Sequence, residues 1–338
     1  MAPHLKIKKI DTALARLAEH EVRCQLCPRE CGVNRIKGEK GFCQSGKEAS
    51  VSHALLHYGE EPVLSGCRDC DESGPTGTRR RSGSGTIFFT GCNLKCSFCQ
   101  NYQLSWLGQG KAASDEELAR MMLKLEAKGA LNINLVSPSH LLLPILRALR
   151  IAYGQGLNLP VVYNANGYEK ADVIMNLDGI IDIYLPDLKY FSSEVAGKFS
   201  GAADYFEHAS PTIKEMFIQR PILVLDKAEI AREGLIIRHL VLPGQTKDSL
   251  AILEWLAKEL STDVYLSLMG QYQPCFRSPK ELQRPLRPEE YQKVLVKAEE
   301  LGFENLFIQP EAFNPEDHLV PDFNLDTPFN WGGKPKDR

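Results

Sequence analysis

The sequence lacks long apolar runs and a strong charge of either sign. Its 338 residues carry 40 Lys and Arg against 43 Asp and Glu, a net charge of −3, and this near balance gives no reason to expect binding to nucleic acid. The N-terminus has no apolar stretch of the secretory type. The most apolar segment, residues 141–146, is soon followed by Arg147 and Arg150, so it is too short to span a bilayer. We therefore expect a cytoplasmic protein without a membrane partner.

Cysteine is scarce in the later part of the chain. Nine of the ten cysteines precede residue 100, and only Cys275 follows it. Without a secretory signal, so many cysteines indicate metal ligation in a reducing compartment rather than a set of disulfides. The uneven distribution predicts a Cys-rich N-terminal extension over residues 1–82, an α/β domain over residues 83–310 and an irregular C-terminal tail over residues 311–338.

The α/β domain shows a regular alternation of short apolar segments with longer amphipathic ones, which predict strands and helices respectively. The expected strands are 85–90, 132–136, 160–163, 180–185, 235–242, 264–269 and 305–308. The expected helices are 114–125, 141–153, 168–176, 204–219, 247–260 and 288–301. Such alternation predicts a parallel sheet with right-handed crossovers. About seven strands favour a partial barrel over a closed barrel of eight strands.

Three cysteines follow the first of these strands at the spacing C-x3-C-x2-C: Cys92, Cys96 and Cys99. Three thiolates can hold three irons of a [4Fe–4S] cluster, which normally takes four cysteines. The fourth iron is then open to a ligand, as the fourth position is in a catalytic zinc site. The loop lies at the carboxyl end of a strand, where α/β folds place their sites. It therefore predicts a metal centre with a chemical role.

This motif, with the aromatic Phe98 before its last cysteine, resembles that of the radical S-adenosylmethionine (SAM) superfamily. Structural zinc is the weaker alternative, because it usually takes four ligands and no second cysteine pair adjoins the loop. The resemblance implies a partial (β/α)6-type barrel in which the open iron binds SAM. A reducing donor of the flavodoxin or ferredoxin type would supply an electron. Reductive cleavage of SAM would then give a 5′-deoxyadenosyl radical that abstracts hydrogen from a substrate.

Two later segments resemble the activating enzymes of glycyl radical enzymes, such as that of pyruvate formate-lyase. They are Asp187-Leu188-Lys189 and the strand 237–244. The resemblance implies that Asp187 and Lys189 lie beside the SAM carboxylate and that His239 lies near the methionine end. Read without it, the Asp187 and Lys189 pair is an ordinary salt bridge at a strand end. Further segments resemble an uncharacterised activase-like branch; they are 24–31, 56–62, 132–136, 162–168 and 271–274.

One activase motif is missing. The Gly-Gly-Glu that follows the second strand, and receives the SAM amino group, is replaced by residues 135–140, Leu-Val-Ser-Pro-Ser-His. Ser137 or Ser139 would have to accept that amino group instead. Asn164, at the end of the third strand, is expected to bond the SAM ribose, with a turn position before Gly167 as the alternative.

A second cysteine set precedes the first. Cys24, Cys27, Cys31 and Cys43 are spaced C-x2-C-x3-C-x11-C, and four thiolates suit either a structural zinc or a second iron–sulfur cluster. Four unligated buried thiols are the third alternative. We assign no role to the pair Cys67 and Cys70 or to Cys275.

The sequence thus predicts a radical SAM oxidoreductase with a protein or peptide substrate, by analogy a glycyl radical enzyme. The alternatives are another peptide or small molecule as substrate or, outside enzymes, an iron–sulfur sensor or electron carrier. An electron carrier would favour a fully ligated cluster, which speaks against that alternative. We expect a polar group at residues 57–61 to line the site, and Gln271 and Tyr272 to contact the substrate.

Overall fold

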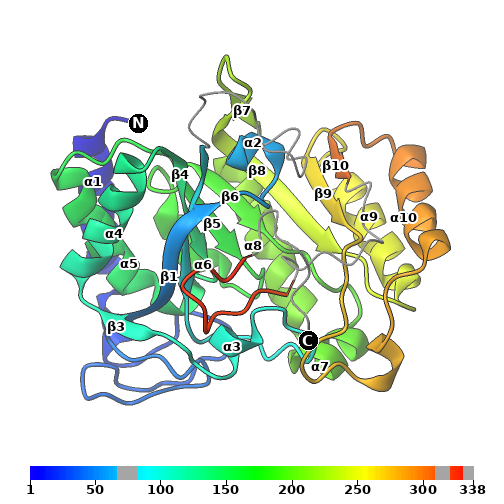
Figure 1. Cartoon of the computed structure of the whole chain (residues 1–338), viewed down its shortest axis with the longest axis horizontal. Coiled ribbons are helices and arrows are strands. Elements are labelled where there is room, and N and C mark those ends of the chain that lie inside the picture. Colours follow the sequence, from blue (N-terminus) through cyan, green and yellow to red (C-terminus); the bar gives the residue numbers. More distant parts are fainter. Residues whose placement is uncertain (67–81, 309–319, 330–338) are drawn as a thin grey trace.

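The computed structural model describes residues 1–66, 82–308 and 320–329 (Figure 1). Cys67 and Cys70 lie outside the described residues, and so do the two outer parts of the predicted C-terminal tail. The described part of that tail, residues 320–329, contains neither helix nor strand.

One large sheet organises the chain, with the strand order β10-β9-β8-β6-β5-β4-β2-β1-β3. Seven of its strands run parallel to one another: β2 (Gly83–Phe89), β4 (Ala130–Val136), β5 (Val161–Ala165), β6 (Ile183–Pro186), β8 (Ala231–Leu240), β9 (Tyr265–Met269) and β10 (Leu306–Ile308). These are the seven predicted strands. Within the described residues the sheet does not close on itself, so the predicted α/β fold with an open, partial barrel is confirmed.

Three further strands run antiparallel. β1 (Ala49–His57) pairs with β2, β3 (Lys111–Ala113) pairs with β1, and the short β7 (Val224–Leu225) pairs with β8. β1 comes from the Cys-rich N-terminal extension, and that part of the extension therefore belongs to the same sheet.

The longer helices lie around the outside of the sheet (Figure 1). The long ones are α1 (Pro3–Leu17), α4 (Asp115–Ala127), α5 (Leu142–Gly154), α8 (Tyr205–Gln219), α9 (Thr246–Glu259) and α10 (Pro288–Glu300). The shorter ones are α2 (Pro62–Ser65), α3 (Tyr102–Ser105), α6 (Ala171–Ile174) and α7 (Ser193–Ser200). α4 begins where the sequence predicts, because Ser114 and Glu117 form a reciprocal capping box. None of the described helices is long and apolar enough to cross a membrane.

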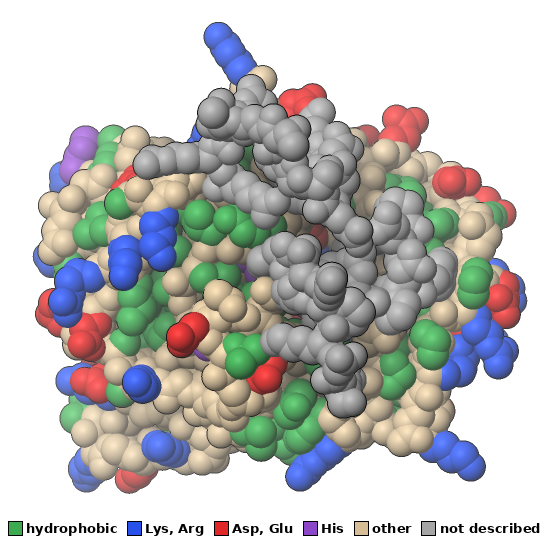
Figure 2. Space-filling model, viewed as in Figure 1, with side chains coloured by type: hydrophobic (Ala, Val, Ile, Leu, Met, Phe, Trp, Pro, Cys, Tyr) green, Lys and Arg blue, Asp and Glu red, His purple; other side chains and the backbone are tan. Residues whose placement is uncertain are grey.

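The N-terminal helix α1 packs on α5 and is fixed to the sheet by a buried lysine. The Lys6 ammonium donates to the Asp182 carboxylate and to the Tyr153 hydroxyl, the latter at 3.0 Å. Burial lowers the pKa of Lys6, against the opposing influence of Asp182. On the face shown in Figure 2, cationic and anionic side chains are intermingled, without an extended area of one sign.

Candidate functional site

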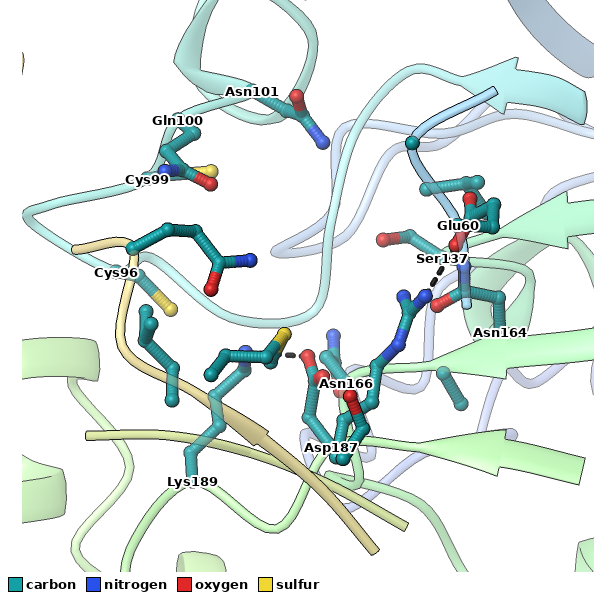
Figure 3. A pocket seen from close by; sticks show the side chains of 18 of the residues that line it. Glu60, Cys96, Cys99, Gln100, Asn101, Ser137, Asn164, Asn166, Asp187 and Lys189 are labelled. Carbon is teal, nitrogen blue, oxygen red and sulfur yellow. Dashed lines mark hydrogen bonds and ion pairs between the residues drawn. The ribbon is translucent and has the colours of Figure 1, made fainter. Parts of the chain in front are cut away.

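A cavity of about 700 Å³ lies at the carboxyl ends of the parallel strands. Most of the site residues expected from the sequence line it (Figure 3); they are Cys92, Cys96, Cys99, Ser137, Asn164, Asp187 and Lys189. His57, Glu60, Glu61, Gln271 and Tyr272 line it as well. The fold thus gathers residues from, or directly after, all seven parallel strands, from β1 and from the loops that follow them around one space.

Each of the three cysteine sulfurs in residues 92–99, the cluster loop, accepts a hydrogen bond from a different part of the fold. Ser200 donates to Cys96 Sγ at 2.9 Å, Ser105 donates to Cys99 Sγ at 3.2 Å and Asn166 Nδ2 donates to Cys92 Sγ at 3.3 Å. Such donors stabilise a thiolate and fix its direction, as supporting residues do around metal ligands.

Two of these thiols are held in their neutral form by burial. Burial raises the pKa of Cys92 to about 11 and that of Cys99 to about 12. Metal ligation requires the thiolate, so binding of a cluster must displace protons from both sulfurs. The three sulfurs, their donors and the adjoining cavity fit a cluster with one open iron.

The glycine before the first cysteine is required by its surroundings. Gly91 has a φ of +79°, and a Cβ there would lie 2.4 Å from the backbone oxygen of Cys43 and 2.9 Å from Ser45 Oγ. A larger residue would push the cluster loop away from the N-terminal segment.

Asp187 and Lys189 form an ion pair in the cavity just past β6, with 2.5 Å between Lys189 Nζ and Asp187 Oδ2. Burial acts to lower the pKa of Lys189, but the Asp187 carboxylate and the Cys96 sulfur outweigh it, and the pKa is raised. The lysine therefore stays charged beside the cluster loop, where it can bind a carboxylate.

β8 presents Arg238, not His239, to the cavity, because successive side chains of a strand point to opposite faces. His239 is 2% exposed and does not line the cavity. Its Nδ1 donates to the Leu188 carbonyl at 2.7 Å, and its Nε2 accepts from Ser249 on α9 at 2.8 Å. Burial lowers the pKa of His239 to about 4, so the ring is neutral. The residue expected near the methionine end of SAM therefore lies on the far side of β8 from the cavity lining.

Arg238 instead joins two glutamates at the cavity wall. Its Nε and Nη2 donate to the Glu61 carboxylate at 2.8 and 2.6 Å, and Nη2 also donates to Glu60. Asn134 Nδ2 donates to Glu60 at 3.0 Å. Burial acts to raise the pKa of Glu61, but Arg238 outweighs it and the pKa is lowered. This wall is therefore ionised and rich in hydrogen-bond acceptors.

The two serines considered for the missing Gly-Gly-Glu lie in different places. Ser137 lines the cavity and has a φ of +56°, whereas Ser139 is buried and donates to the Glu169 carboxylate. Tyr163 also donates to Glu169, at 3.2 Å. Burial raises the pKa of Glu169 to about 7, although both hydrogen bonds act to lower it. Of the two serines, only Ser137 can meet a ligand in the cavity.

A segment near the C-terminus completes the cavity wall, which the sequence did not reveal. Residues 320–329 cross to the β1 side of the sheet (Figure 1), and Phe329 lines the cavity. The Gln103 amide holds this segment, since its oxygen accepts from the Phe323 N–H at 2.7 Å and its nitrogen donates to Asp322 at 2.9 Å.

The four N-terminal cysteines, together called the N-terminal cysteine site, line a second cavity of about 10 Å³; they are Cys24, Cys27, Cys31 and Cys43. The Phe42 N–H donates to Cys31 Sγ at 3.3 Å and Arg35 donates to Cys43 Sγ at 3.6 Å. Burial raises the pKa of Cys27 to about 12. Within the described parts of the chain, no group of three or more His, Cys, Asp or Glu side chains is arranged to hold a single metal ion.

Arg29 joins the two cysteine sets. Its Nε donates to the carbonyl of Asn93, next to Cys92, at 2.9 Å, and its Nη2 donates to the carbonyl of Gly201 at 2.8 Å. The guanidinium also lies 4.0 Å from the centre of the Phe42 ring, a cation–π contact. The N-terminal cysteine site is therefore fixed directly to the cluster loop.

Comparison with known proteins agrees with this geometry. Residues 86–256 match the radical SAM superfamily, and the chain belongs to it. The superfamily implies a [4Fe–4S] cluster and SAM as cofactors. The narrower likeness to glycyl radical activases stays a prediction.

Two relatives come from Methanocaldococcus jannaschii, and both are uncharacterised. The protein MJ0674 is 31% identical over 296 residues, which are 84% of this chain and 76% of the relative. The protein MJ0808 is 31% identical over 91 residues, 27% of this chain and 26% of the relative.

Among solved structures, SuiB of Streptococcus suis bound to the precursor peptide SuiA is similar at a TM-score of 0.41 and 12% identity. The match covers 64% of this chain and 46% of the SuiB chain. This likeness is too slight to carry an argument about function.

Proposed function

We propose that the chain is an enzyme that holds a [4Fe–4S] cluster on Cys92, Cys96 and Cys99 and binds SAM across the adjoining cavity. The observation that carries this proposal is the meeting of three hydrogen-bonded cysteine sulfurs with a charged lysine in one cavity of about 700 Å³. When bound, the reduced cluster supplies the electron that cleaves SAM and starts hydrogen abstraction from a substrate.

Different residues of the cavity would bind different groups of SAM. Lys189, oriented by Asp187, would neutralise the SAM carboxylate. Ser137 would accept from the amino group in place of the missing glutamate, and Asn164 would bond the ribose. All four line the cavity, which supports these roles. The buried position of His239 leaves it the role of fixing the Leu188 carbonyl, next to Lys189.

For the substrate, we propose a protein or peptide, by analogy a glycyl radical enzyme. Its support is the likeness of the Asp187-Leu188-Lys189 segment and of residues 237–244 to the activases. Gln271 and Tyr272, on the loop after β9, line the cavity and would contact that substrate.

We further propose that the N-terminal cysteine site holds a metal centre, either a zinc ion or a second iron–sulfur cluster. Its support is that four cysteines spread over residues 24–43 line one small cavity, with an N–H and a guanidinium directed at their sulfurs. Both centres accept four thiolates, and metal analysis distinguishes them.

The decisive experiment is anaerobic reconstitution with iron and sulfide, followed by reduction with dithionite and addition of SAM. We expect 5′-deoxyadenosine and methionine in equal amounts. A protein that acquires the cluster but forms neither product would contradict the proposal and would favour an iron–sulfur sensor or electron carrier.

A further inference from the structure

A group of aromatic and cationic side chains lies on the outer side of the cluster loop, away from the cavity. It consists of Lys95, Trp106, Leu107, Phe276 and Arg277, and we call it the outer patch. None of these five residues lines the SAM cavity. They come from the cluster loop itself, from the end of α3 and from the loop after β9.

The outer patch, together with the adjoining Cys275, is hydrogen-bonded to three consecutive carbonyls of the cluster loop. Trp106 Nε1 donates to the Cys96 carbonyl at 3.0 Å, and the Arg277 N–H donates to the Ser97 carbonyl at 3.1 Å. Cys275, two residues before Arg277 in the loop after β9, donates from Sγ to the Phe98 carbonyl at 3.3 Å. Only one layer of side chains therefore separates the protein surface from the backbone of the cluster ligands.

Aromatic rings and cations are interleaved in the patch. Phe276 stacks on Tyr102 with 4.6 Å between ring centres and 10° between planes. The Arg277 guanidinium lies 4.9 Å from the centre of the Trp106 ring, and Lys95 Nζ lies 5.3 Å from it on a cation–π contact. Among the described residues, neither Lys95 nor Arg277 forms an ion pair with a carboxylate; the Lys95 ammonium donates to the Ser105 carbonyl at 2.5 Å.

Two features of the patch suit a partner surface. Leu107 is 57% exposed and Phe276 is 36% exposed, so apolar area is open to solvent beside the two cations. Phe276 also has a φ of +52°, which is unfavourable for an aromatic residue and holds its ring outward against Tyr102. Trp, Tyr and Arg are the residues that most often carry the energy of protein interfaces.

We propose that the outer patch is the docking surface for an acidic one-electron carrier protein, and that the electron reaches the cluster through the Trp106, Arg277 and Cys275 contacts to residues 96–98. The inference rests on the proposed function, because it assumes a cluster on this loop. In each encounter a flavin hydroquinone of the carrier is oxidised to the semiquinone, and the cluster is reduced by that one electron.

Charge complementarity argues for an acidic carrier, since unpaired cations raise the rate of encounter with an anionic partner. SAM and substrate occupy the opposite side of the loop, so the carrier and the substrate would not compete for one surface.

The experiment measures the second-order rate constant for reduction of the reconstituted cluster by a reduced, acidic flavodoxin in a stopped-flow instrument, at several ionic strengths. Arg277→Glu and Leu107→Glu should each lower the rate constant at low salt by about tenfold, and Leu107→Lys should raise it, because steering depends on charge. The differences should shrink at high salt. The matched controls are Ile218→Glu and Ile218→Lys on α8, where the side chain is 72% exposed and no change is expected.

A redox titration of each variant distinguishes an effect on docking from an effect on the cluster. A docking residue changes the rate constant for reduction by the carrier and leaves the midpoint potential of the cluster unchanged. Equal rate constants for Leu107→Glu and Leu107→Lys would overturn the proposal, as would a wild-type cluster that dithionite reduces but flavodoxin does not. If dithionite fails to reduce the cluster as well, the proposed function fails, and the two failures are thereby distinguished.

Discussion

The cluster loop and the N-terminal cysteine site lie against each other, yet their surroundings are opposite. The cluster loop adjoins a cavity of about 700 Å³ that also contains a charged lysine and an arginine. The N-terminal cysteine site encloses about 10 Å³, lined chiefly by its own loops. Three cysteines beside open space leave room for a ligand, whereas four around a closed one satisfy a metal fully. The size of the space beside the sulfurs, as much as the number of sulfurs, therefore distinguishes a site that can bind a further ligand from a closed site.

Removal of one cysteine from each set should give the largest difference between the two sites. Cys96→Ala should abolish formation of 5′-deoxyadenosine, because two thiolates cannot hold a cluster with one open iron. Cys31→Ala, at the exposed member of the N-terminal cysteine site, should leave the cluster loop able to bind its cluster. Iron content, visible absorption and product analysis after anaerobic reconstitution measure both. Retention of SAM cleavage in Cys96→Ala would disprove the assignment.

Loss of the metal proposed for the N-terminal cysteine site should lower the stability of the protein and leave SAM cleavage intact. Cys27→Ala removes a buried thiol of this site and should lower the thermal midpoint by roughly 10 °C. The expected loss in the free energy of unfolding is about 4 kcal/mol, and each kcal/mol lowers the midpoint by about 2–4 °C. Metal analysis against the wild type then names the centre: about four fewer irons for a cluster, or one fewer zinc. An unchanged midpoint with unchanged metal content would show that the site holds no metal.

The charged residues of the open cavity should set the affinity for SAM. Lys189→Met should raise the Kd for SAM by about 30-fold, because a lost partner of a buried charge costs about 2 kcal/mol. His239→Gln should raise the Kd far less, because His239 is outside the cavity and acts only through the Leu188 carbonyl next to Lys189. Equilibrium binding to the reconstituted protein measures both. A larger rise in the Kd for SAM in the His239 variant than in the Lys189 variant would contradict the role given to Lys189.

The smallest expected effect concerns Glu169, a buried carboxylate whose charge acts on Cys27 and whose hydrogen bond holds Ser139. Its pKa is raised from 4.5 to about 7, so between these values the native state binds more protons than the unfolded state and stability falls as the pH rises. Glu169→Gln should remove this fall, and its stability relative to the wild type should grow by about 1–3 kcal/mol from pH 4.5 to pH 8. Denaturant unfolding across this range measures it, with the exposed Glu304→Gln as control. Parallel pH profiles for Glu169→Gln and the wild type would contradict the prediction.

Apolar periodicity was sufficient to predict the seven parallel strands, because buried strands between helices are apolar on both faces. It did not predict β1, where apolar and polar residues alternate irregularly in Ala49–His57, or the helix α1. The cysteine spacing led to the cluster loop directly.

The sequence alone could not predict which face of β8 lines the cavity. Strand alternation requires that Arg238 and His239 point to opposite sides, but it does not say which one meets the cavity, and the resemblance to activases pointed to His239. Arg238 faces the cavity because Glu60 and Glu61, brought in from the β1 end, neutralise it there. The contact of Gln103 with residues 320–329 joins segments more than 200 positions apart, and no local pattern carries it.

The contacts of Arg29 have a consequence for how the chain is made. Arg29 is synthesised before its partners, which are the carbonyls of Asn93 and Gly201, and Lys6 depends in the same way on Asp182. The segment that holds Lys6 and Arg29 must therefore wait for its partners, 172 and 176 positions later for Gly201 and Asp182, before it can settle. Pairings of such wide separation form late and slowly. During that interval the four N-terminal thiols stay accessible, as uptake of the metal proposed for them would require.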